Sequence, residues 1–207
     1  MAARKGSSRR WLQRQRRDVY VRQAQAQGYP SRAAFKLLEI DARDRLLRPG
    51  MKVVDLGAAP GGWSQVAAER VGAAGKVVAV DRLPMEVPAG VLFYQGDFQE
   101  AATLDWIMTA FQETPADVVL SDMSPNLSGN RAVDQPRAML LAELALDLCS
   151  KILKPGGDFL VKLFQGEGFD PFYRAVQREF SKLLIRKPEA SRKNSREVYL
   201  LAKQRKL

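Results

Sequence analysis

Histidine is absent from the 207-residue chain, and cysteine occurs once, at Cys149. Without histidine, Ser-His-Asp and Cys-His nucleophilic catalysis are excluded, and no set of ligands suited to zinc remains. We therefore expect no metal site, and any general base must be an aspartate, a glutamate, a lysine or a tyrosine. One cysteine forms no internal disulfide, and its place in an apolar helical pattern indicates a core residue.

Long apolar runs are also missing. No stretch approaches the roughly 18 residues of a membrane-spanning helix, and no apolar segment follows the basic N-terminus as it would in a signal peptide. We therefore expect a cytoplasmic protein that does not interact with membranes. The length and the apolar fraction of 46% suit one globular domain. We assign residues 18–207 to it and residues 1–17 to a basic tail, too highly charged to fold alone.

Acidic residues are scarce at both ends of the chain. Residues 1–36 contain ten Lys or Arg against one Asp, a net +9, and residues 182–207 contain nine against two Glu, a net +7. The stretch between them has fourteen basic and twenty acidic residues, a net −6. An acidic body with basic ends predicts that segments 1–36 and 182–207 bind a polyanion and line one side of a ligand cleft. A solubility tail would explain residues 1–17 but not the C-terminal segment, which also has strand character.

Segments rich in β-branched residues alternate with helical ones along the chain. The pattern predicts helices over 31–47, 61–72, 98–111, 132–153 and 169–180, and strands over 52–57, 76–81, 91–97, 116–122, 158–164, 182–188 and 195–203. This alternation is typical of an α/β protein with a doubly wound, mostly parallel sheet. No helix separates the last two strands, so we expect them to pair antiparallel.

Carboxylates follow several of the predicted strands. Ligands of such a sheet bind beyond the carboxyl ends of its strands, and the first strand ends in VVDLGAAPGGW, with Asp55 before a glycine-rich turn. The next three strands end in Asp81, Asp97 and Asp122. Turn formation alone would explain any one of these acids, but it explains four successive ones less well.

The turn and the acids fit two cofactor classes. A glycine-rich turn followed by an acid for a ribose diol occurs with NAD, but residues 57–62 do not match GxGxxG. Asp97 is placed to contact an adenine amino group. Because S-adenosylmethionine has an adenosine but no pyrophosphate, the pattern favours this methyl donor over a dinucleotide.

Lys162 lies within the otherwise apolar strand DFLVKLF. A buried ammonium is costly unless it is paired or has lost its proton. A lysine whose chain reaches solvent along the sheet edge is the alternative interpretation. The strand-end carboxylates nearby favour a functional role.

Five motifs, SRAAFKL, DLGAAPGGW, SDMSPN, VKLFQG and SREVYL, occur in this order between about Asp18 and Ala202. Together they resemble the FtsJ (RrmJ) family of ribosomal RNA 2′-O-methyltransferases. The resemblance implies a Rossmann-like methyltransferase fold that uses S-adenosylmethionine, with a mostly parallel seven-stranded sheet and an antiparallel C-terminal strand. It further implies the bacterial type of enzyme, which methylates a uridine ribose of 23S rRNA in the large ribosomal subunit; we expect a monomer.

The resemblance also assigns roles to residues. A catalytic Lys-Asp-Lys-Glu tetrad of the family falls on Lys36, Asp122, Lys162 and Glu197. Family contacts with S-adenosylmethionine fall on Gly61, Trp63, Asp81, Asp97 and Asp122.

Physical chemistry makes this assignment reasonable. A ribose hydroxyl attacks poorly until a base removes its proton, and the resemblance gives that task to Lys162. Burial, the second cation at Lys36 and the donor's sulfonium all favour an uncharged Lys162. Asp122 would orient Lys162 beside the sulfonium, and Glu197 would hold Lys36 or the ribose.

Other functions are disfavoured to different degrees. Pyrimidine C5 methylation needs a cysteine nucleophile, which Cys149 in mid-helix is poorly placed to supply. Adenine amino-methyltransferases carry a Pro-Pro-aromatic motif where this chain has Met123-Ser124-Pro125. Ribose methylation of tRNA or of an RNA cap stays open because those enzymes share the fold and the tetrad. A non-catalytic RNA-binding ribosome assembly factor is disfavoured because all four tetrad residues are present.

Overall fold

The computed structural model describes residues 18–111, 114–192 and 195–207, so the predicted tail over residues 1–17 lies outside it. The strands are β1 Lys52–Leu56, β2 Lys76–Asp81, β3 Val91–Gln95, β4 Ala116–Ser121, β5 Leu153–Phe164, β6 Phe180–Arg186 and β7 Glu197–Arg205. The helices are α2 Val19–Ala26, α3 Ala33–Asp44, α4 Gly62–Val71, α5 Ala101–Ala110, α6 Arg131–Ile152 and α7 Phe169–Glu179. Of these helices, none is long and apolar enough to cross a membrane.

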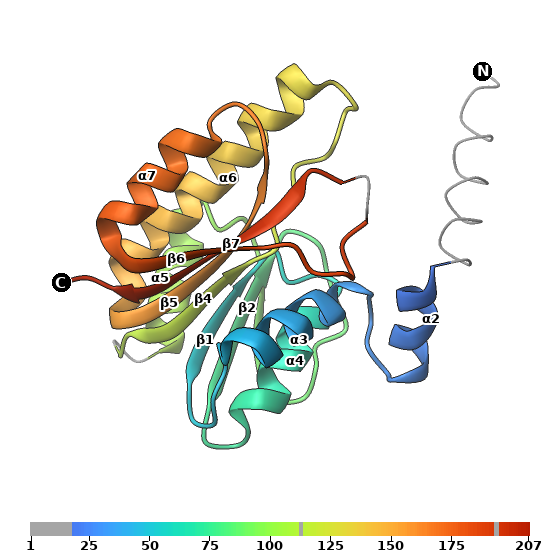
Figure 1. The fold of residues 1–207 in the computed structure, drawn as a ribbon. Helices are drawn as coiled ribbons and strands as arrows, with labels where there is room; N and C mark the ends of the chain where they lie inside the picture. Colours follow the sequence, from blue (N-terminus) through green and yellow to red (C-terminus); the bar gives the residue numbers. More distant parts are fainter. Residues whose placement is uncertain (1–17, 112–113, 193–194) are drawn as a thin grey trace.

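The seven strands form one sheet in the order β3-β2-β1-β4-β5-β7-β6 (Figure 1). Strands β1 to β5 pair in parallel, whereas β7 is antiparallel to β5 on one side and to β6 on the other. The predicted α/β fold is thus confirmed, with its mostly parallel sheet, its antiparallel C-terminal strand and the antiparallel pairing of the last two strands. The insertion of β7 between β5 and β6 goes beyond what was predicted.

Pairs of valines in the central strands explain why helices cover both faces of the sheet. Successive residues of a strand point to opposite faces. Val53 packs in a core with Leu37 of α3, whereas its neighbour Val54 packs in a second core with Ala145 of α6. Figure 1 shows α3 and α4 on one side of the sheet and α6 and α7 on the other.

Near the N-terminus the structure differs from the prediction by one additional helix and one earlier helix end. Helix α2 was not predicted, because VYVRQAQA has a weak apolar pattern; it begins after Asp18, whose side chain accepts a hydrogen bond from the Tyr20 backbone N–H. Helix α3 ends at Asp44, before the predicted end at residue 47, because Arg45 adopts a left-handed conformation with φ of 50°.

Strand β5 begins at Leu153, earlier than the predicted start at Asp158. Leu153 pairs with Ala116 of β4, the register then shifts, and Asp158 pairs with Val118. The Lys-Pro-Gly-Gly sequence between the predicted helix and the predicted strand therefore forms an irregular opening of the strand.

The direction of β7 determines which residues meet at the ligand edge of the sheet. The carboxyl ends of parallel strands β1 to β5 gather at one edge, and an antiparallel strand must present its first residues there. Glu197, the first residue of β7, pairs with Phe164 at the end of β5, and Tyr199 pairs with Lys162. The C-terminal strand thus contributes side chains to the same edge as the strand-end carboxylates.

Candidate active site

The four residues of the predicted tetrad come from four different elements and form two adjoining ion pairs. Lys162 of β5 lies 3.0 Å from the carboxylate of Asp122, which follows β4, and its side chain is only 7% exposed. Lys36 of α3 lies 2.7 Å from Glu197 of β7. The structure therefore brings all four side chains together, and the buried Lys162 is paired rather than extended into solvent.

Tyr199 connects the two ion pairs. Its hydroxyl donates a hydrogen bond to Asp122 Oδ1 at 2.7 Å and accepts one from Lys36 Nζ at 3.0 Å. Its fully buried ring packs on Trp63, with 5.5 Å between the ring centroids. The hydroxyl thus links the two lysines: it binds Lys36 directly and Lys162 through Asp122.

The sequence contained a signal for Tyr199 that the motif comparison did not use. Residues two apart in a strand share a face, so Tyr199 had to project beside Glu197, and a buried tyrosine hydroxyl needs a hydrogen-bond partner. The pattern could not identify those partners, Asp122 and Lys36. Asp122 follows β4 and Lys36 lies on α3, both far from Tyr199 in the sequence.

Opposing effects act on the acids of this cluster. Burial acts to raise the pKa of Asp122, but the charges of Lys162 and Lys36 and the Tyr199 hydrogen bond outweigh it, so the pKa is lowered. Burial, followed by the negative charges of Asp122 and Glu197, raises the pKa of Tyr199 well above its ordinary value. Asp122 is therefore an anion and Tyr199 a neutral donor at neutral pH.

The predicted cofactor acids Asp81 and Asp97 are each partly engaged with neighbouring residues, and Asp81 also bonds to the glycine-rich turn. Asp81 accepts hydrogen bonds from the backbone N–H groups of Ala59 and Leu83, at 2.9 and 2.8 Å. Asp97 accepts one from the Gln99 N–H at 3.1 Å and lies 3.7 Å from Arg82. A carboxylate has about four acceptor positions. Both acids therefore keep acceptor capacity for a ribose diol or an amino group.

Gly61 and Trp63 lie at the start of α4, where the turn becomes helix. Gly61 has a φ of 104°, a conformation that favours glycine. Trp63 is 2% exposed and its indole N–H donates to the Ala33 carbonyl at 2.8 Å. The Trp63 side chain is thus a packing link between α3, α4 and Tyr199, so the predicted cofactor contact at this position would have to come from its backbone.

Asp55 is the one strand-end acid that lies completely inside the protein. Its Oδ2 accepts a hydrogen bond from Ser64 Oγ at 2.6 Å, and its Oδ1 finds no donor in the described part of the chain. Burial is the main cause that raises its pKa to about 7; the Ser64 bond lowers it, and the charges of Asp122 and Asp81 raise it. Asp55 is therefore held by one hydrogen bond in the interior, where its protonated form is favoured.

Comparison with known proteins places this geometry among methyltransferases. The family model described as FtsJ-like methyltransferase matches residues 29–205. The chain is 62% identical over 200 residues to Ribosomal RNA large subunit methyltransferase E of Alkalilimnicola ehrlichii, covering 97% of this chain and 96% of that protein. It is 55% identical over 201 residues to the protein of the same name from Cellvibrio japonicus, covering 97% and 95%.

A solved structure is also similar. It is the crystal structure of a Plasmodium falciparum protein described as a ribosomal RNA methyltransferase, with a TM-score of 0.77 and 26% identity. The similarity covers 86% of this chain and 98% of that one. The arrangement of strands and helices is therefore shared well beyond close relatives.

The raised pKa of Asp55 predicts a pH dependence of stability. Because its folded pKa of about 7 lies above the ordinary 3.8, native Asp55 keeps a proton that the unfolded chain loses above about pH 4. The stabilisation is complete below that pH and is lost as the pH rises through about 7. Asparagine does not titrate. The unfolding free energy of Asp55→Asn minus that of the wild type should therefore rise by up to about 4 kcal/mol as the pH increases from about 4.5 to 7.5.

Urea denaturation at a series of pH values measures this difference. The exposed Asp105 of α5 provides the control, since Asp105→Asn should follow the wild-type curve at every pH. If the Asp55→Asn curve also runs parallel to the wild type, burial does not hold a proton on Asp55.

The bridging hydroxyl of Tyr199 predicts a stability loss that is independent of ring packing. Tyr199→Phe keeps the contact with Trp63 but leaves Asp122 and Lys36 each without one hydrogen-bond partner, so we expect a loss of about 1–2 kcal/mol in unfolding free energy. Tyr173→Phe is the matched control, because the Tyr173 ring stacks on Phe169 and its hydroxyl makes no hydrogen bond to the described residues. Equal effects in the two variants would contradict the bridging role.

Proposed function

Because the chain belongs to the FtsJ-like methyltransferase family, we propose that it methylates the 2′-oxygen of a uridine ribose in 23S rRNA of the large ribosomal subunit. The observation that carries this proposal is the buried ion pair of Lys162 and Asp122 at the sheet edge, next to a second pair of Lys36 and Glu197. Relatives that are 55% and 62% identical are named as methyltransferases of large-subunit ribosomal RNA.

We propose S-adenosylmethionine as the methyl donor. It supplies a methyl group bound to a positively charged sulfur. Asp81 and Asp97 would hold its ribose and adenine, Gly61 and the backbone of Trp63 would form the wall of the turn, and Asp122 would face the positive charge. Support comes from the acceptor capacity that Asp81 and Asp97 keep beside their backbone hydrogen bonds.

In this proposal the residues of the tetrad position the ribose and move its proton. Lys162 Nζ takes the proton from the 2′-hydroxyl as that oxygen attacks, which requires Lys162 to be uncharged at that moment. Asp122 and the Tyr199 hydroxyl keep Lys162 and Lys36 in fixed directions. Lys36, held by Glu197, is the cation that lies beside the attacking oxygen.

The substrate RNA would contact the basic residues that are not used within the fold. Arg32 is bound to Asp18 and to the Ala190 carbonyl, and Arg186 makes a two-pronged pair with Asp44. Arg192, in contrast, is exposed and follows Ser191, whose hydroxyl donates to Glu197 at 2.9 Å. Exposed arginines of this kind near the tetrad are suited to phosphates.

The structure differs in one respect from the expectation that all of segment 182–207 lines the cleft. The sheet register pairs Phe180 with Arg205 and Lys182 with Lys203, at the end of β7 away from Glu197. Lys182, Lys203 and Arg205 therefore lie toward the opposite edge, whereas the described residues of this segment next to the tetrad are 191–192 and 195–199. We propose that these residues, helix α2 and the tail over residues 1–17 form the RNA-binding side of one catalytic domain, which acts as a monomer in the cytoplasm.

The direct test is transfer of a labelled methyl group from S-adenosylmethionine to ribosomal subunits, followed by mapping of the modified nucleotide. The proposal expects one 2′-O-methylated uridine in 23S rRNA. Methylation of tRNA instead of rRNA would identify the tRNA alternative, and binding to subunits without methyl transfer would identify an assembly factor.

Lys162 provides the sharpest catalytic prediction. Lys162→Arg keeps a cation beside Asp122 but cannot accept a proton, so methyl transfer should fall by about a hundredfold or more. Affinity for S-adenosylmethionine, measured by calorimetry, should stay within a few fold. Lys154→Arg is the control, because Lys154 is paired with Asp117 at the far end of the same strand. A Lys162→Arg enzyme with wild-type rate and an unchanged pH profile would exclude the base role.

The proposed RNA side predicts a change in salt dependence. The double variant Arg22→Gln, Arg192→Gln removes two exposed charges of the proposed RNA-binding side and should weaken RNA binding. The slope of log K against log salt should become shallower by about 0.7 for each lost phosphate contact. Cofactor affinity should not change. Lys182→Gln with Lys206→Gln at the opposite edge is the matched control, and equal weakening by both pairs would contradict the assignment.

A further inference from the structure

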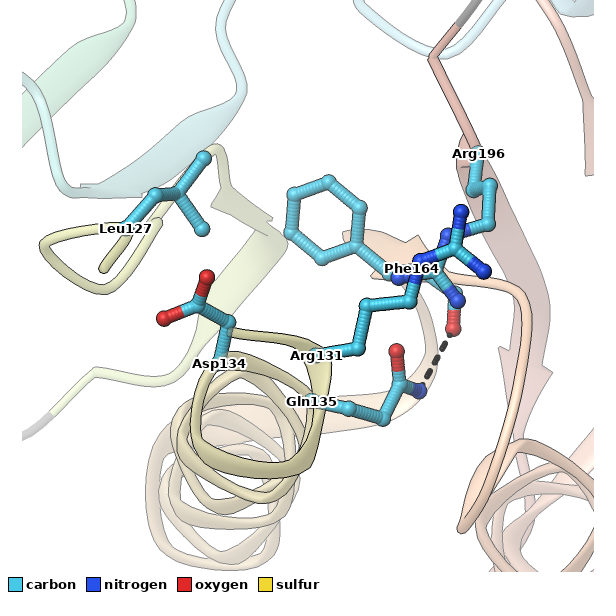
Figure 2. A pocket seen from close by; sticks show the side chains of 6 residues that line it. All are labelled: Leu127, Arg131, Asp134, Gln135, Phe164 and Arg196. Carbon is cyan, nitrogen blue, oxygen red and sulfur yellow. Dashed lines mark hydrogen bonds between the residues drawn. The ribbon is translucent and has the colours of Figure 1, made fainter. Parts of the chain in front are cut away.

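A pocket of about 190 Å³ adjoins the tetrad at the end of β5 and the start of α6 (Figure 2). Its lining residues are Leu127, Arg131, Asp134, Gln135, Phe164 and Arg196. Pockets that enclose a drug-sized ligand are larger, at roughly 300 Å³ or more. This one therefore suits a single ring system.

Gln135 gives the pocket a fixed hydrogen-bond acceptor. Its Nε2 donates to the backbone carbonyls of Phe164 and Glu167, both at 2.9 Å. Turning the amide over would place Oε1 against those two carbonyl oxygens, so the orientation is determined. Gln135 is 6% exposed, and its Oε1 has no donor in the described ranges of the chain.

Figure 2 shows where this acceptor points. The amide nitrogen of Gln135 is hydrogen-bonded to the Phe164 carbonyl of β5, and the amide oxygen is on the side of the pocket. A buried acceptor without a partner costs about 1–3 kcal/mol. A ligand that brings an N–H group into the pocket would remove this cost.

Phe164 supplies an aromatic face close to the tetrad. Lys162 and Phe164 are two residues apart in β5, so their side chains project from one face with about 6.6 Å between the Cα atoms. Phe164 is half-buried and pairs with Glu197. This spacing allows a base stacked on Phe164 and a sugar at Lys162 to belong to the same nucleotide.

The charges around the pocket favour a phosphate-linked ligand. Arg131 and Arg196 both lie beside Phe164 in Figure 2, and the Arg196 guanidinium donates a hydrogen bond to the Gln165 carbonyl at 2.9 Å. The one acid of the lining, Asp134, accepts hydrogen bonds from Ser128 N–H, Ser128 Oγ and Gly129 N–H, which hold its carboxylate against the preceding loop. The pocket therefore presents two cations against one anion, an aromatic face and a fixed acceptor.

We infer that this pocket receives the nucleobase of the nucleotide whose ribose is presented to Lys162. The base stacks on Phe164, its Watson–Crick edge donates an N–H to Gln135 Oε1, and the arginines contact the adjoining phosphates. Uracil carries one such donor, at N3. The inference rests on the proposed function and specifies how that site takes hold of its substrate.

Binding of two RNA strands tests whether the pocket holds a base. A decamer of uridines and an abasic ribose-phosphate decamer are titrated against the wild type, Phe164→Leu and Phe93→Leu, at one salt concentration. Phe93 is a half-buried phenylalanine on β3, which three strands separate from β5. Phe164→Leu should weaken the uridine strand about fivefold or more and leave the abasic strand unchanged. Phe93→Leu should change neither.

Loss of affinity for both strands, or for neither, would overturn the inference. Because only binding is measured, the result can be read even if methyl transfer to rRNA fails, and the two proposals can therefore fail separately. Thermal unfolding of the Phe164→Leu protein confirms that the variant is folded at the temperature of the titration.

Photocross-linking of the wild-type protein tests the identity of the base without any variant. A 5-iodouridine replaces the methylated uridine in a short rRNA fragment, and mass spectrometry locates the adduct after irradiation. An adduct at Phe164 supports the inference. An adduct confined to residues outside the pocket would show that the target base lies elsewhere.

Discussion

Strand β7 runs against both of its neighbours, and this direction is the constraint on which the site depends. Parallel strands present only their carboxyl ends at the ligand edge of the sheet, whereas β7 presents its first residues. Glu197 and Tyr199 therefore meet Asp122 and Lys162, although the four residues come from distant parts of the chain. A last strand that ran parallel would leave Lys36 without its carboxylate and Asp122 without the tyrosine hydroxyl.

The two lysines of the site are held differently, and the difference suits different tasks. Lys162 lies at 7% exposure against Asp122, whose carboxylate also accepts a hydrogen bond from the Tyr199 hydroxyl. Lys36 lies on helix α3, outside the sheet, and is paired with Glu197 of β7. Tyr199 links them through a hydroxyl that stays protonated, and it lets one strand position both amines. In the proposed reaction Lys162 moves the proton while Lys36 stays a cation.

Much of this arrangement could be predicted from the sequence, for reasons that are local. Segments rich in β-branched residues predicted the strands, and the glycine-rich turn with its strand-end acids predicted the ligand edge. Lys162 stood out because an ammonium within an apolar strand needs a partner. The partner itself, the bridging role of Tyr199 and the burial of the Trp63 side chain depend on how α3, α4 and β7 pack, which periodicity does not specify.

Other differences have physical causes of the same kind. The basic C-terminal segment looked uniform in sequence, yet the strand register sends its residues to opposite edges of the sheet. The Gln135 amide is fixed by backbone carbonyls at Phe164 and Glu167, far along the chain. Composition thus predicted a polyanionic ligand, and tertiary contacts determine which residues are free to meet it.

The central claim is that a ribose hydroxyl meets the amine of Lys162 at this edge. A crystal structure of the protein with the demethylated cofactor and an RNA fragment would test it most directly. The account predicts that Lys162 Nζ lies within hydrogen-bond distance of the ribose 2′-oxygen, about 2.6–3.2 Å. A bound RNA whose 2′-oxygens all lie away from Lys162, with the cofactor in place beyond the strand ends, would contradict it.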